Sequence, residues 1–210
     1  MFVNIGYYLI EKTLNPKKNI PLLTASDCVC NIYPQSDIYL DNTKMLIDSE
    51  YLRCLGLTVD ETLQFMKEIQ KLRAENKIAV DRRFSCIDDA RRVYNKYLKR
   101  VENIQLISIS VEEKELPILR EEMEEEFFFV KDKEKGEEIG YDILGWDLTG
   151  FHSYFCNELD EIINAKYIIE YNEFGLIKNS FENVKTFVRL IEGQGEQVEW
   201  LPFKVEGYHL

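Results

Sequence analysis

The residue types best suited to chemistry gather between Gly140 and Cys156. Three glycines recur there every five residues, and around them stand Tyr141, Asp142, Trp146, Asp147, Phe151, His152 and Cys156. Glycine allows close backbone approach, so this segment is the first place to look for a site. No Gly-Lys-Ser/Thr follows, and the spacing does not fit a dinucleotide fingerprint. The structural alternative is a twisted strand whose glycines make bulges or close packing.

Two arrangements within this segment suggest catalysis. His152, Cys156 and Asp160 stand at i, i+4 and i+8, so on a helix they would form one row in which an imidazole reaches a thiol. Such groups usually come from different elements, and a partly buried cysteine beside a helix-flank histidine is the default. Asp142 and Asp147 fall on opposite faces of a regular strand, and only a glycine bulge would bring them together for acid/base work. A small hydrolase or transferase using Asp142, Asp147, His152 or Cys156 is therefore the alternative hypothesis, and no residue is assigned as catalytic.

Charge is unevenly distributed along the chain. There are 26 Lys and Arg against 38 Asp and Glu residues, a net charge of −12. Residues 1–105 hold 16 basic and 14 acidic residues, whereas residues 106–210 hold 10 basic and 24 acidic ones. Phosphate binding requires clustered Lys and Arg, so the sequence argues against a nucleic-acid ligand.

The acidic stretch from Glu112 to Glu138 holds 12 acidic and 5 basic residues. A solvated helix face explains it, and the functional alternative is a landing surface for a basic protein, because complementary charge selects partners. Phe127 to Phe129 follow the glutamates directly, either as core or as an apolar anchor ringed by charge. The candidate partner-binding residues are Glu121, Glu122, Glu124, Glu125, Phe128, Asp142, Trp146, Asp147 and His152.

Other classes of function are disfavoured. No apolar run approaches the ~18–20 residues of a membrane span, and the N-terminus lacks the features of a secretory signal. Five scattered cysteines indicate reduced thiols in the cytoplasm. With two histidines in the chain, we expect neither a metal site nor a cofactor.

The elements that would position these residues begin with a strand over 2–10. Residues 15–43 suggest short strands and loops. Thr58 and Glu61 have capping-box spacing, which predicts a helix from there to about residue 77. A second helix begins near Ser85, and its outer face carries Arg91, Arg92, Lys96, Lys99 and Arg100, a solvated or anion-binding row. Apolar residues on both faces predict a buried strand over 104–111.

The second half continues with a helix opening at Pro117, a strand at 127–130 and a longer strand over 139–148. Phe151, Phe155, Leu159 and Ile162 suggest a helix face. A short strand at 167–171, a helix capped by Ser180 and a strand over 198–205 complete the chain. Pro202 suggests an edge or a bulge in that last strand.

This irregular alternation predicts an α+β fold with a mixed or antiparallel sheet and helices packed on it. One domain over 1–210 is favoured; the fallback is a helix-rich part over 1–103 and an acidic α+β part over 104–210. The size, the acidity and the segments 140–156 and 200–203 resemble the acidic cytosolic immunity proteins of bacterial toxin–immunity systems. That resemblance implies a non-enzymatic protein that blocks a basic toxin. It covers mainly the second half and carries no diagnostic motif, and it leaves the oligomeric state open.

Overall fold

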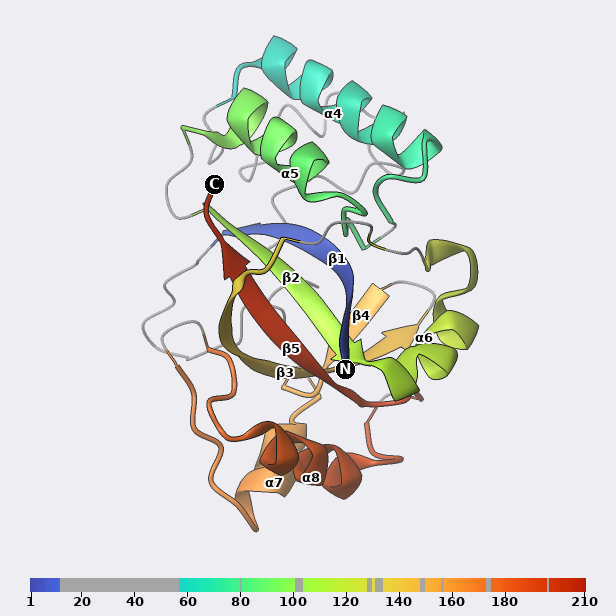
Figure 1. Cartoon of the computed structure of the whole chain (residues 1–210), viewed down its shortest axis with the longest axis vertical. Coiled ribbons are helices and arrows are strands. Elements are labelled where there is room, and N and C mark those ends of the chain that lie inside the picture. Colours follow the sequence, from blue (N-terminus) through green and yellow to red (C-terminus); the bar gives the residue numbers. More distant parts are fainter. Residues whose placement is uncertain are drawn as a thin grey trace.

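The computed structural model describes residues 1–11, 57–79, 81–100, 104–127, 130, 134–147, 150–155, 157–172, 175–195 and 197–210. Within them, a curled five-stranded antiparallel sheet has the order β1-β2-β5-β3-β4 (Figure 1). The strands are β1 (Phe2–Glu11), β2 (Ile104–Glu112), β3 (Glu137–Asp147), β4 (Gly150–Ser153) and β5 (Leu201–Tyr208). The expected α+β class with helices on a sheet is confirmed, and the sheet is antiparallel. It joins β1 to strands that lie more than ninety residues later in the chain.

Helices cover the sheet in three places. α4 (Val59–Ala74) and α5 (Ile87–Val93) lie at one end, where their apolar faces pack with Tyr7 and Leu9 of β1. α7 (Leu159–Asn164) and α8 (Phe181–Ile191) lie at the opposite end in Figure 1, packed on Ile143 of β3. α6 (Leu116–Met123) packs on the other face of the sheet, over residues such as Trp146 and Phe203. The described residues thus form three hydrophobic clusters around one sheet.

The helix starts follow local sequence. Thr58 and Glu61 make the expected capping box at the start of α4, which satisfies amides that have no partner inside the helix. Pro117 lies in the first turn of α6, where its missing N–H costs nothing. The Ser180 hydroxyl accepts from the Asn183 amide and caps α8. α5 continues as a π-helical turn over Tyr94–Leu98.

Two predicted elements of the second half are wrong. The helix face read from Phe151 is a strand, because β4 pairs with β3 and Phe151 lies opposite Trp146. Only 159–164 is helical there. No strand forms over 167–171, where Tyr171 makes a single bridge to Ile177. Whether a short apolar run becomes a strand depends on pairing with distant segments, which hydrophobic periodicity does not reveal.

Pro202 does not mark an edge strand. β5 is central, between β2 and β3. Its pairing with β2 begins only at Lys204, so at Pro202 the strand is paired on one side alone, with Ile143 of β3. A residue without an N–H is tolerated at such a locally unpaired position. The expected strand over 198–205 begins and ends three residues later.

The other predicted strands fall partly within and partly outside the residues that the structure describes. The strands over 2–10, 104–111 and 139–148 are confirmed with shifts of a residue or two. The expected short strands over 15–43 fall outside the described residues. Of the expected strand over 127–130, the middle two residues also fall outside, and the two described ends are not in a strand. Among the described helices, none is long and apolar enough to cross a membrane.

Candidate functional site

The acidic surface is the outer side of α6 and of the 3₁₀ turn that follows it, Glu124–Glu126. Leu116, Leu119 and Met123 face the sheet at i, i+3 and i+7 and are buried. The helical period therefore turns Glu121 and Glu122 outward, and Glu124 and Glu125 follow in the 3₁₀ turn. Glu121, Glu122, Glu124 and Glu125 are all exposed, and among the described residues none of the four makes an ion pair.

The basic row on α5 and the π-helical turn is arranged differently. Glu68 of α4 pairs with Arg92 at 3.3 Å and with Lys96 at 2.5 Å. Three further pairs neutralise the row: Arg91–Glu134 at 2.8 Å, Arg92–Asp89 at 2.6 Å and Arg100–Glu61 at 3.4 Å. Four of the five cations in the row are thus paired within the protein. This pairing removes the anion-binding alternative for most of the row.

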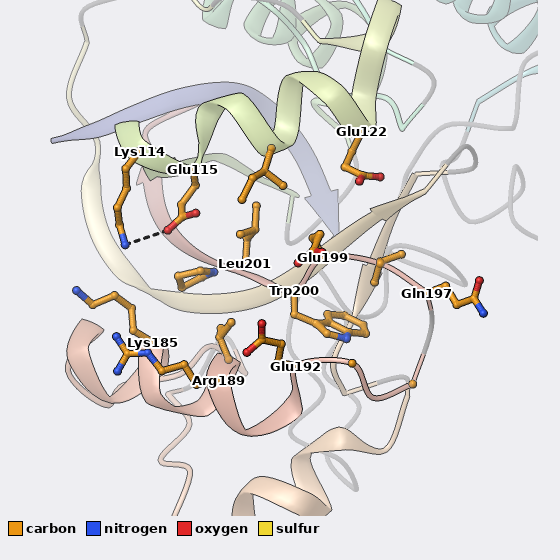
Figure 2. Close-up of a pocket in the computed structure, with 16 residues that line it drawn as sticks. Lys114, Glu115, Glu122, Lys185, Arg189, Glu192, Gln197, Glu199, Trp200 and Leu201 are labelled. Atoms are coloured by element: carbon orange, nitrogen blue, oxygen red, sulfur yellow. Dashed lines mark ion pairs between the residues drawn. The ribbon is translucent and has the colours of Figure 1, made fainter.

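An open groove of about 570 Å³ lies between α6 and α8 (Figure 2). One wall comes from the start and outer side of α6, and the facing wall comes from α8. The floor is the segment that leads into β5. The lining residues are Lys114, Glu115, Ile118, Glu122, Lys185, Val188, Arg189, Glu192, Gly193, Gly195, Gln197, Val198, Glu199, Trp200, Leu201 and Pro202. The groove therefore joins the acidic surface through Glu122.

Sequence reasoning did not find this groove. Among the predicted site residues whose side chains the structure describes, Glu122 alone lines it. Trp200, at the floor of the groove, is buried, and its indole N–H donates to the Gln194 carbonyl at 2.9 Å. The polar side of α8, with Lys185, Arg189 and Glu192 at helical spacing, was a usable signal. Nothing in the sequence indicated that this side faces α6.

Two glycines of the Gly140–Cys156 segment, Gly140 and Gly145, have structural roles. The register of β3 against β5 shifts at Gly140, which is the expected bulge. A β-carbon at Gly145 would lie 2.2 Å from a methyl of Val198, so that glycine permits close packing. Gly140 and Gly145 thus agree with the structural alternative for this segment, a strand whose glycines make bulges or close packing.

Asp142 is wholly buried. One carboxylate oxygen accepts from the Ile143 amide at 2.8 Å, and the other has no hydrogen-bond partner among the described residues. Burial raises the pKa of Asp142 to about 8, and the Ile143 hydrogen bond only partly opposes this. Asp142 offers no surface to a partner, contrary to its proposed binding role.

The other candidates of this segment are dispersed. Trp146 is 3% exposed and packs edge-to-face on Phe151 at 5.0 Å, so it too is a core residue rather than a surface residue. His152 is half-buried on β4, not on a helix, so the row with Asp160 of α7 does not form. Asp147 ends β3, and its side chain, like Cys156 and Phe128, falls outside the described residues. Of the candidates that the structure describes here, neither Trp146 nor His152 lines the groove.

A buried arginine, which the sequence did not single out, links the parts of the fold. Arg83 has no exposed surface. Its guanidinium donates to the carbonyls of Ile5 at 3.0 Å and Glu126 at 2.9 Å, and lies 3.4 Å from the Asp81 carboxylate. The Tyr8 hydroxyl donates to the same carboxylate. These contacts tie β1 to the end of the acidic turn, so they hold the acidic surface in place.

Among the described residues, no group of three or more His, Cys, Asp or Glu side chains is arranged to hold a metal ion. Comparisons with protein-family models, with curated proteins and with solved structures each found no match.

Proposed function

We propose that this chain is a non-enzymatic protein-binding module whose acidic surface, Glu121, Glu122, Glu124 and Glu125, docks a basic partner protein. The observation that carries the proposal is that these four carboxylates are exposed and unpaired among the described residues, while the basic row is neutralised internally. Unpaired charges of one sign steer an oppositely charged partner and select it. The resemblance to immunity proteins would make that partner a basic toxin met in the cytoplasm.

The enzyme alternative has less support. The two candidate residues whose side chains the structure describes, Asp142 and His152, do not line the groove. Asp142, which has the raised pKa that an acid catalyst would need, is sealed from solvent by its burial. No specific observation brings it together with His152, and the proposal therefore assigns no catalytic residue.

The test compares two variants that lose the same charge. In one, Glu121, Glu122, Glu124 and Glu125 are changed to Gln; in the control, the exposed Glu137, Glu158, Glu161 and Glu170 are changed to Gln. Wild type and both variants are used to capture proteins from the source cells at low and high salt, and the affinity of the captured basic protein is then measured by calorimetry. We expect the control to bind like wild type and the α6 variant to bind about 10–100-fold more weakly, since four charge contacts are removed at ~0.2–1 kcal/mol each.

Binding that is lost at high salt in the wild type would agree with charge-driven docking. Equal weakening in both variants would show that net charge, not the α6 surface, is responsible. Capture of no basic protein at either salt concentration would contradict the proposal.

A further inference from the structure

The two walls of the groove repeat one pattern. Along α6 the order is Glu115, Ile118 and Glu122; along α8 it is Lys185, Val188 and Glu192. Each set has the i, i+3, i+7 spacing of one helix face. Both walls therefore have an apolar residue in the middle and a carboxylate at the C-terminal end. Leu201 and Pro202 add a mainly apolar floor between them.

The two ends of the groove differ in how their charges are satisfied. Lys114 and Lys185 lie together at one end in Figure 2. Lys114 pairs with Glu112 at 3.2 Å and Glu115 at 3.0 Å, and Lys185 pairs with Glu182 at 2.5 Å. The lysine end is thus neutralised within the protein.

The other end holds carboxylates without cations. Glu122, Glu192 and Glu199 are exposed, and among the described residues none of them makes an ion pair. α6 ends at Met123 and α8 at Ile191, so both helices direct their C-termini toward this end. The partial negative charge of a helix C-terminus adds to the attraction for a cation.

Resting on the proposed function, we propose that this groove binds one short segment of the basic partner, with a Lys or Arg at the Glu122–Glu192–Glu199 end and an apolar neighbour between Ile118 and Val188. The volume lies within the ~300–1,000 Å³ that encloses drug-sized ligands, which suits a short peptide segment. Arg189, exposed and likewise unpaired among the described residues, can donate to main-chain carbonyls of the bound segment. An apolar anchor beside a charge matches the usual anatomy of a binding hot spot.

The first experiment uses peptides, and the indole N–H of Trp200 as the reporter. The probe is a pool of acetylated, amidated pentapeptides with lysine fixed at the centre and Ala, Leu, Val or Phe at the flanks. The comparison pool has norleucine, which keeps the apolar stem but lacks the charge. Trp200 lines the groove and Trp146, the other tryptophan, does not, so Trp146 serves as an internal reference in ¹⁵N spectra. We expect the lysine pool to shift Trp200 alone, and the norleucine pool to bind about tenfold more weakly.

A groove variant, Glu192→Gln with Glu199→Gln, should bind the lysine and norleucine pools with nearly equal affinity. The matched control, Glu158→Gln with Glu161→Gln, removes the same charge on exposed positions away from the groove and should bind like wild type. No shift of Trp200 at saturating pool concentrations, or equal shifts with lysine and norleucine, would overturn the inference.

The second experiment separates this inference from the proposed function. The groove variant is tested against the basic protein captured by wild type, and its affinity should fall about tenfold. If affinity is unchanged while the four-residue α6 variant still loses binding, the partner uses the acidic surface but not the groove, and only the inference fails. If wild type captures no basic protein, the proposed function fails, whatever the peptide pools show.

Discussion

Two helix surfaces of this protein carry rows of like charge, and they differ in whether those charges are paired within the fold. The basic row around α5 faces α4, whose Glu61 and Glu68 neutralise it, together with Asp89 and Glu134. The four outward glutamates of the acidic surface make no ion pair among the described residues, although Lys185 and Arg189 of α8 lie across the groove from α6. A row of charge along one helix therefore does not tell whether the row is available to a partner. Its neighbours in space decide that.

The difference also separates stability from binding. Glu68 holds two cations and accepts from the Tyr97 hydroxyl at 2.8 Å, so it joins α4 to the next helix. Burial alone would raise the pKa of Glu68, but the hydrogen bonds from Lys96 and Tyr97 lower it overall. The glutamates of α6 join nothing within the described part of the chain. Changes at the first surface should affect folding, and changes at the second should affect partner binding.

The largest effect is expected at a carboxylate that lacks a cation and is also buried. The pKa of Asp142 is raised from 3.8 to about 8, so folding favours its protonated form. The stability gained is complete below the unfolded pKa and is lost as the pH rises toward the folded pKa. Relative to wild type, Asp142→Asn should therefore become more stable by a few kcal/mol as the pH rises between about 4 and 8.

Urea unfolding of both proteins across this pH range measures the effect. The hydroxyls of Tyr154 and Tyr171 lie in the same environment as the Asp142 carboxyl, and burial raises the pKa of both tyrosines. A pH-independent difference between wild type and Asp142→Asn would mean that the carboxylate is not sealed from water. The contrast between a buried and an exposed unpaired carboxylate would then be lost.

The next largest effect is expected at Glu68. Glu68→Gln should lower the free energy of unfolding by about 1–2 kcal/mol, because it weakens two ion pairs and a hydrogen bond at a mostly buried side chain. Glu121→Gln, on the unpaired surface, is the control and should change it by less than ~0.5 kcal/mol. Chemical denaturation at low salt compares the two variants. Equal losses of stability would show that the paired and the unpaired surface contribute alike to folding.

The smallest effect is expected when all four glutamates of the acidic surface are changed to Gln. Stability should stay constant or rise slightly at low salt, because repulsion between like charges is relieved. The same variant should lose partner binding, as proposed above. Thermal unfolding at low and high salt provides the measurement. A decrease of more than ~1 kcal/mol in the free energy of unfolding would show that these exposed carboxylates make contacts that stabilise the fold.

The sequence alone determined the features that depend on near neighbours in the chain. The capping box of Thr58 and Glu61, the place of Pro117 in the first turn of α6 and the Ser180 cap use groups a few residues apart, and all three are present. The outward direction of Glu121 and Glu122 likewise follows from the helical period of the buried leucines on α6. Local hydrogen bonding and periodicity are sufficient for these, because they do not depend on the rest of the fold.

Only the tertiary structure decided which side chains meet across the fold. It placed His152 on a strand, buried Asp142 and Trp146, and enclosed Arg83 among carbonyls from β1 and the acidic turn. It also brought α6 and α8, more than fifty residues apart, to the two sides of one groove. Strand pairing and burial are long-range, so whether a charged residue is paired, buried or open to a partner is set by elements distant in sequence.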